Sequence, residues 1–175
     1  MGQIFFPQQE QGEGTSQKRL IIQKESIRKY DLAYLGECLV QGELAKRNFR
    51  VMRATFSFDF LGENGSRIEV KAALPSRTSK LRKGRFYEYK IWQFRLTTEK
   101  QQDCDFFVCV PFDVDGKTPL GYFIFPRHSI NTLGKSNTIS VYETDLSGNS
   151  KVRNKMNRNQ YMNSWDLIFS FNKKC

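Results

Sequence analysis

The sequence predicts a single domain, α/β or α+β, in which a mixed β-sheet is flanked by helices. An amphipathic helical segment comes first and is followed by a series of apolar, mostly alternating segments that are typical of strands. The chain has 175 residues, enough for one domain with its own core. Hydrophobic residues make up 39% and charged residues 26%, as in ordinary globular proteins.

The first helix is expected over residues 26–48. Ser26 suits its N-cap, and Asn48 suits a left-handed residue at its end. Four apolar side chains fall on one face of it: Leu32, Leu35, Leu39 and Val40. Before it, the Gln- and Gly-rich residues 1–18 predict a flexible N-terminal arm, although the apolar Ile4, Phe5 and Phe6 allow it to dock instead. Residues 19–175 then form the domain.

A β-hairpin is expected next. Residues 49–61 alternate and are rich in aromatic side chains, as a strand requires. Asn64 and Gly65 form a hairpin turn signal, and residues 67–74 follow as the antiparallel partner strand.

The remaining segments are less regular. Residues 75–85 predict a basic loop. Residues 86–96 allow a helix or a strand, with a strand favoured, and residues 164–171 leave the same choice open. Further strands are expected at 105–112, 120–125 and 138–143.

Charge and cysteine content narrow the class of protein. The net charge of +10 favours polyanionic partners, although a surface that is basic by chance explains it equally well. Cys104 and Cys109 flank an apolar run, and the chain has one histidine, so a zinc site is disfavoured. No leader-like or membrane-length apolar segment is visible, which predicts a cytoplasmic protein without membrane contact.

Three ionisable residues carry the chemical signal. Asp59 lies near the end of the first hairpin strand, and Glu69 and Lys71 lie two residues apart on its partner, so they share one face. Two neighbouring carboxylates repel each other unless a cation lies between them. Carboxylate oxygens suit Mg²⁺, and an adjacent lysine can position water or balance charge on a phosphate.

This order of residues resembles the PD-(D/E)XK nuclease superfamily. The resemblance covers LGECLVQGELAKRNFRV, then FDFL, then RIEVKA, within residues 35–72. It implies a restriction-endonuclease-like or Holliday-junction-resolvase-like core, although Phe58 stands where the family has a proline. Gly-Tyr-Phe-Ile-Phe and neighbouring segments are similar to later strands of small members.

The resemblance also implies roles for single residues. Asp59 and Glu69 would bind Mg²⁺, for which Mn²⁺ is a possible substitute, together with the carbonyl of Val70. Lys71 matches the catalytic lysine and Glu37 the helix glutamate, so the catalytic set is Glu37, Asp59, Glu69 and Lys71. Glu43 is the rival helix carboxylate; six residues from Glu37, it points to a different face.

Two basic clusters are candidate DNA contacts, although a solvated loop is the alternative for each. The first would contact phosphates beside the cleaved bond, and the second is interleaved with asparagines that can read base edges. The residues are Arg77, Lys80, Arg82, Lys83 and Arg85 in the first, and Lys151, Arg153, Lys155 and Arg158 in the second.

The sequence therefore predicts a Mg²⁺-dependent DNA endonuclease that acts on duplex or branched DNA as a homodimer. A non-catalytic nucleic-acid-binding module on the same fold is the main rival. A structural or interaction protein that is basic by chance is the third reading.

Overall fold

The computed structural model describes residues 31–55, 57–130, 137–146 and 158–172. The chain divides into two units, Met1–Asp31 and Leu32–Cys175, and every labelled element belongs to the second. The predicted N-terminal arm, residues 1–18, lies outside the described residues. The first labelled elements are β1 (Val51–Arg53), β2 (Phe60–Gly62), β3 (Arg67–Ala73), β4 (Ser76–Arg82), β5 (Arg85–Arg95), α2 (Thr98–Asp103) and β6 (Phe106–Pro111). They are followed by β7 (Phe123–Pro126), α3 (Arg127–Ile130), β8 (Thr138–Tyr142), α4 (Glu143–Leu146), the 3-10 helix η1 (Arg158–Tyr161) and α5 (Asp166–Phe169).

The described fold is mixed α/β with two sheets, where the sequence predicted one. The larger sheet has the order β1-β2-β3-β6-β7, and the smaller has the order β4-β5-β8. In the larger sheet β3 and β6 run parallel while the other neighbours are antiparallel. The mixed character of the sheet and the flanking helices are thus confirmed at this coarse level.

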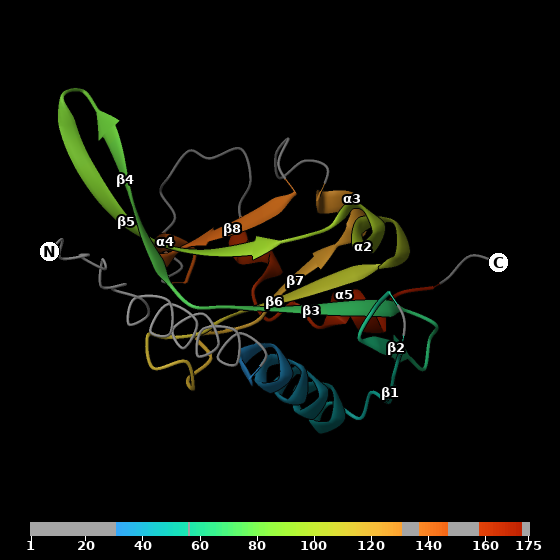
Figure 1. Cartoon of the computed structure of the whole chain (residues 1–175). Coiled ribbons are helices and arrows are strands. Elements are labelled where there is room, and N and C mark those ends of the chain that lie inside the picture. Colours follow the sequence, from blue (N-terminus) through green and yellow to red (C-terminus); the bar gives the residue numbers. More distant parts are fainter. Residues whose placement is uncertain (1–30, 56, 131–136, 147–157, 173–175) are drawn as a thin grey trace, which may run out of the picture. The chain divides into compact units, whose positions relative to one another are not determined.

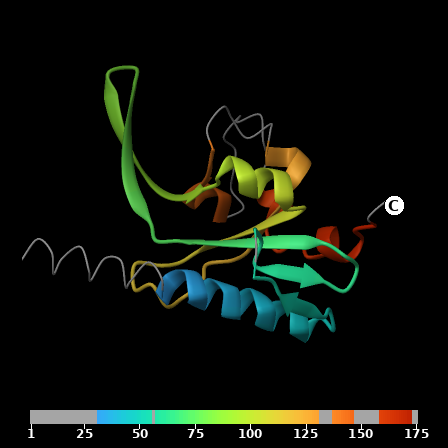
Figure 2. The same cartoon turned by 45° about the vertical axis from the view of Figure 1, so that its right-hand side comes forward.

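The N-terminal helix is described over residues 31–46. Asn48, the left-handed residue expected at its end, follows two residues later and has a φ of 59°. The amide of Phe49 turns back to the carbonyl of Leu44 at 3.0 Å, so the chain reverses into β1. Figures 1 and 2 show this helix along one face of β3, with α2 and the smaller sheet on the other.

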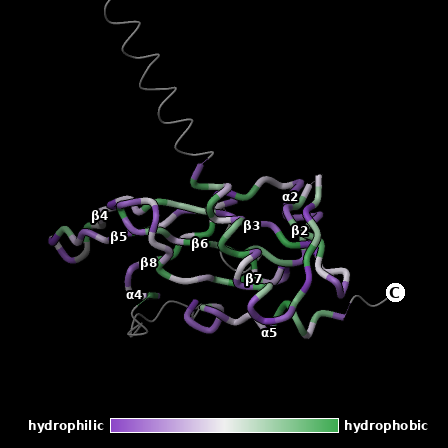
Figure 3. Tube along the Cα trace, turned by 90° about the horizontal axis from the view of Figure 1, so that it is seen from below, coloured by the Kyte–Doolittle hydropathy of each residue, from purple (hydrophilic) through white to green (hydrophobic). Residues whose placement is uncertain are grey.

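The core divides at the larger sheet. Ile68 and Val70 pack into the cluster beneath the N-terminal helix and α5. Ala73 and Phe107 pack into a second cluster with β5 and β8. β6 lies between the two clusters and is buried along its whole length, which explains its unbroken apolar sequence (Figure 3).

The prediction of one continuous strand over residues 49–61 is wrong. The segment forms two short strands, β1 and β2, which pair with each other, and a bend separates them. The predicted turn around Asn64 and Gly65 is confirmed, since β2 pairs antiparallel with β3 across it. Gly65 has a φ of 80°, and the side chain of Asn64 accepts from the amide of Ser66 at 3.1 Å.

The predicted basic loop over residues 75–85 is also wrong. β4 and β5 form a hairpin around Lys83 and Gly84, whose φ angles are 48° and 74°. Two adjacent residues with positive φ make the tight turn that matches the twist of paired strands. The strand favoured for 86–96 is therefore confirmed, and the hairpin extends away from the larger sheet (Figure 1).

The later segments agree with most expectations. The predicted strands at 105–112 and 138–143 correspond to β6 and β8. The strand predicted at 120–125 begins later, at Phe123, and includes Pro126. Residues 164–171, left open between strand and helix, contain the short helix α5.

Candidate active site

Asp59 lies in the bend just before β2 and not within a strand. Its amide donates to the carbonyl of Ile68 at 3.0 Å, and its Oδ2 accepts from the amide of Val70 at 2.7 Å. The hydrogen bond from the Val70 amide to the Asp59 side chain thus extends the β2–β3 pairing beyond the first residue of β2. These two contacts fix the Asp59 carboxylate at the edge of β3.

The Val70 carbonyl faces the same edge as Asp59. In a strand, the amide and carbonyl of one residue point to the same side, and the Val70 amide is the group bound by Asp59. The carbonyl that the resemblance implies as a metal ligand therefore points to the side of β3 that Asp59 occupies.

Glu69 is the most deeply buried charged group of the site. Its side chain is 1% exposed, on the face of β3 opposite Ile68 and Val70. Lys71 Nζ contacts Oε1, and Lys100 Nζ donates to Oε2 at 2.7 Å. Burial and the nearby Asp59 carboxylate raise the pKa of Glu69 above its usual value, and the two lysines only partly offset this.

Lys100 was not singled out from the sequence. It lies in α2, which begins after Thr97, whose Oγ1 accepts from the amide of Lys100 at 3.3 Å. Burial alone would lower the pKa of Lys100, but the hydrogen bond and charge of Glu69 raise it above its usual value. Thr97 is a readable N-cap signal. However, α2 has no buried residue, so hydrophobic periodicity could not reveal it.

Glu37 reaches the site from the N-terminal helix. Arg53 in β1 donates to Glu37 Oε2 at 2.7 Å. Burial and the charge of Asp59 raise the pKa of Glu37, while Arg53 works in the opposite direction. The charge of Asp59 thus contributes to the raised pKa of both Glu37 and Glu69.

The rival residue, Glu43, has different surroundings. Lys46 Nζ donates to its Oε1 at 2.8 Å, and Arg47 binds the other oxygen. These hydrogen bonds lower the pKa of Glu43. Its carboxylate is committed to the end of its own helix, whereas that of Glu37 is bound by Arg53 in β1.

Gly36 explains how the helix approaches so closely. A Cβ at this position would lie 3.0 Å from the Cβ of Ala72 in β3. The absence of a side chain lets the helix backbone lie against the strand that carries Glu69 and Lys71. The neighbouring Glu37 is thereby held at the site.

Among the described residues, no group of three or more His, Cys, Asp or Glu side chains is arranged to hold a metal ion. The donors present are the carboxylates of Asp59 and Glu69 and the Val70 carbonyl. Mg²⁺ usually binds through one or two protein carboxylates and completes its shell with water or phosphate. The Asp59 carboxylate contributes to the raised pKa of the buried Glu69, and the donors fit Mg²⁺ in kind.

The first basic cluster lies on the β4–β5 hairpin. Arg82 and Arg85 are opposite one another in register beside the turn, and Lys83 and Arg85 are exposed. Arg77 lies nearer the base, where its Nη1 is 3.9 Å from Glu88 Oε2. The basic run therefore lies on two paired strands and not in the loop that was expected.

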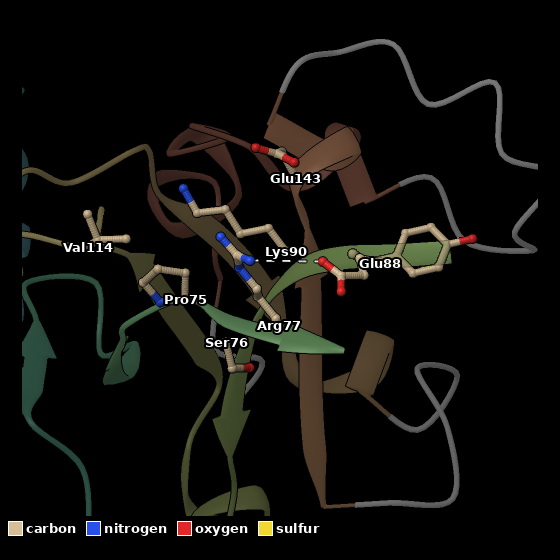
Figure 4. Close-up of a pocket in the computed structure, with 8 residues that line it drawn as sticks. Pro75, Ser76, Arg77, Glu88, Lys90, Val114 and Glu143 are labelled. Atoms are coloured by element: carbon tan, nitrogen blue, oxygen red, sulfur yellow. Dashed lines mark ion pairs between the residues drawn. The ribbon is translucent and has the colours of Figure 1, made fainter. Parts of the chain in front are cut away.

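A cavity of about 390 Å³ opens at the base of the hairpin, with Arg77, Glu88, Lys90 and Glu143 among its lining residues. Figure 4 shows the ion pair between Arg77 and Glu88 inside it. Two acids balance two cations there, so the cavity has no strong preference for an anion.

The second basic cluster is only partly described. Lys151, Arg153 and Lys155 lie outside the described residues. Arg158 differs from the expectation of a free phosphate contact, because its side chain is 12% exposed and lies 3.6 Å from Asp145. Its guanidinium also covers the ring of Tyr142, so packing accounts for this residue.

Three cysteines lie among the described residues. Cys38, Cys104 and Cys109 are free thiols; Cys104 is buried just before β6, and Cys109 is buried within it. Burial raises the pKa of Cys104 to about 12, which keeps it a neutral thiol.

No family model matches the chain, and no curated protein matches it either. No helix in the described ranges has both the length and the apolar character needed to cross a membrane.

Proposed function

We propose that the chain is a Mg²⁺-dependent DNA endonuclease with a restriction-endonuclease-like core. The observation that carries the proposal is the position of Asp59. It is bound to β3 through Val70, and its charge contributes to the raised pKa of both Glu37 and Glu69. These residues are the acidic set that the resemblance to PD-(D/E)XK nucleases implies.

The fold supports the same proposal. β3, which carries Glu69 and Lys71, pairs parallel with β6 from Ile68↔Phe106 to Ala73↔Pro111. Arg67 and Asp105 join the starts of these strands through two hydrogen bonds of 3.0 Å. The charged residues therefore lie on the central part of a rigid sheet, which suits a preorganised site.

Asp59, Glu69 and the Val70 carbonyl would hold the cation. When bound, Mg²⁺ supplies a Lewis acid for a phosphoryl oxygen and lowers the pKa of a ligating water. Lys71 would hold the attacking water or neutralise the charge that develops on phosphorus. Glu37 would orient water from the helix side of Asp59, and the resemblance implies a product with a 5′-phosphate.

The hairpin cations would bind the phosphate backbone of the substrate. β4 begins after Leu74 and Pro75, directly beyond the strand of Glu69 and Lys71. DNA bound along the hairpin would thus continue toward the proposed site. Action on both strands of a duplex would further require a homodimer, as in the enzymes that the chain resembles.

One observation favours the second candidate, a DNA-binding module without chemistry. Each oxygen of Glu69 already has an ammonium partner, Lys71 on one side and Lys100 on the other. The buried carboxylate is thereby neutralised from within the chain. Such an arrangement stabilises the fold whether or not a cation is held.

A plasmid-nicking assay in Mg²⁺ or EDTA separates the two candidates. The full chain and the D59A variant would be tested on plasmid and on duplex, nicked, branched and single-stranded oligonucleotides. D166A makes the same chemical change at an exposed aspartate in α5 and serves as the matched control. We expect Mg²⁺-dependent cleavage by the parent and D166A and a loss of roughly 10³-fold in D59A. Equal cleavage by D59A would refute the assignment, and DNA binding without cleavage by the parent would favour the second candidate.

The third reading, a protein that is basic by chance, predicts no salt-sensitive DNA binding. Lys83 and Arg85 test it, since each phosphate contact contributes about 0.9 to the slope of log K against log salt. We expect the K83Q/R85Q double variant to reduce that slope by nearly 2, with K117Q unchanged as a control at an exposed lysine outside the hairpin.

A further inference from the structure

The tip of the β4–β5 hairpin exposes two large apolar side chains. Leu81 is 61% exposed and Phe86 is 76% exposed. They are directly opposite one another in the strand register, one position before the turn pair Arg82 and Arg85. Leu81 and Phe86 therefore form one apolar pair, which we call the tip pair.

Packing within the chain does not explain the tip pair. Neither residue belongs to either hydrophobic cluster of the described core. A cross-strand pair of this kind adds only about 0.2–1 kcal/mol to a hairpin. An exposed apolar pair on a projecting ribbon also favours unwanted strand association, so its presence points to a partner.

The charge around the tip pair identifies the kind of partner. Residues 76–90 contain one acid, Glu88, and six cations: Arg77, Lys80, Arg82, Lys83, Arg85 and Lys90. This excess would make two copies of the hairpin repel each other. A partner that suits both the cations and the tip pair is a polyanion with an apolar interior. Duplex DNA is such a partner, because its phosphates enclose stacked base pairs.

The shape of the hairpin fits the same partner. The turn at Lys83 and Gly84 is only two residues long, so the ribbon ends narrowly. A two-stranded β-ribbon fits the major groove of B-DNA. Apolar side chains that enter a groove can separate neighbouring base pairs and kink the duplex.

We propose that the β4–β5 hairpin is an arm that enters a groove of duplex DNA, where the tip pair wedges between two base pairs. The flanking cations bind the phosphates on either side of the groove. This inference rests on the proposed function and deepens it: the substrate is duplex DNA that the arm distorts next to the site on β3.

The test uses duplexes that carry 2-aminopurine, whose fluorescence rises when it is unstacked. The full chain would be titrated in EDTA, so that no cleavage occurs, with the probe moved along the duplex. We expect a rise at a restricted position with the parent chain. The L81A/F86A double variant should bring the signal back to that of free DNA and weaken binding roughly 10-fold.

Val114 supplies the matched control. It is 71% exposed and lies outside the hairpin, in the turn after β6, so V114A removes a similar exposed apolar group from another place. V114A should unstack the probe as the parent does. Equal melting temperatures for the variants would show that the fold is kept.

Three outcomes would overturn the proposal. The first is a double variant that unstacks the probe as well as the parent does, and the second is a parent chain that gives no rise at any position. The third is a tip pair that controls self-association of the chain without DNA. Cleavage by the parent in Mg²⁺ separates this inference from the proposed function. Unstacking in EDTA by a parent chain that does not cleave in Mg²⁺ would reject the nuclease alone, and cleavage without unstacking would reject the arm alone.

Discussion

The site on β3 and the β4–β5 hairpin are both rich in charge, but they hold their charges in opposite ways. Glu69 is 1% exposed and has two lysine partners, Lys71 and Lys100. In the hairpin, Arg77 and Glu88 are 87% and 74% exposed and 3.9 Å apart. A buried charge must be paired for the fold to tolerate it, whereas an exposed pair such as Arg77 and Glu88 contributes little to stability. The proposed function assigns chemistry to the first region and DNA binding to the second.

The largest expected effect divides these two roles. K71M removes the ammonium beside Glu69, so DNA cleavage in Mg²⁺ should fall roughly 10²–10⁴-fold while DNA affinity stays nearly constant. The double variant K83Q/R85Q should show the reverse pattern, with weaker binding and normal cleavage at saturating enzyme. Single-turnover cleavage and filter binding measure the two quantities. A loss of DNA affinity in K71M equal to its loss of cleavage would break the division.

The next effect concerns the stability of the two kinds of ion pair. K100M leaves Glu69 with one cation partner in a buried position, which should cost about 1–3 kcal/mol in the free energy of unfolding. K90M removes the more exposed pair with Asp113, where the distance is 3.3 Å, and should cost about 0–1 kcal/mol. Urea unfolding of both variants gives the comparison. Equal losses in the free energy of unfolding for K100M and K90M would mean that burial does not make the Glu69 ion pair stronger than the Lys90 ion pair.

A smaller effect tests how the helix brings Glu37 to the site. Replacing an exposed helical glycine by alanine gains up to about 1 kcal/mol, and G42A should show this because no atom lies within 4 Å of the added Cβ. G36A should lose that gain or become destabilising, because its Cβ would meet that of Ala72 at 3.0 Å. Thermal unfolding measures both changes. A stabilising G36A equal to G42A would show that the helix does not depend on this close approach.

The smallest expected effect is a dependence of stability on pH. The raised pKa of Glu69 means that the folded chain binds its proton more tightly than the unfolded chain does. Its contribution to stability is therefore full below the unfolded pKa, about 4.3, and is lost as pH rises through the higher folded value. E69Q lacks this loss, so without metal the melting temperature of E69Q relative to that of the parent should rise from about pH 4 to 7. A constant difference across this range would contradict the assigned shift.

Local features of the fold were readable from the sequence, but contacts between distant segments were not. The apolar stripe of the helix, the left-handed Asn48 and the turn at Gly65 all follow from short-range preferences. The bend that divides β1 from β2 was missed because residues 54–59 are as alternating and aromatic as a strand. The hairpin was missed because Lys83, a residue that rarely has a positive φ, occupies its turn.

The same limit applies to the candidate site. The sequence placed Asp59, Glu69 and Lys71 near one another through a single hairpin, which is a local inference. Lys100 comes from a polar helix that reaches Glu69 across 31 positions of sequence, and nothing in its own segment indicates that contact. The folding of Arg158 against Asp145 is likewise a tertiary effect that a basic run cannot reveal.

The proposed chemistry depends on a divalent cation binding between Asp59 and Glu69. Titration of the full chain with Mn²⁺, followed by the paramagnetic resonance of the free ion, measures this directly. We expect a bound ion in the parent and in D166A, with affinity lowered about 10–100-fold or more in D59A and E69Q. Mn²⁺ binding that is the same in D59A as in the parent would contradict the proposed site.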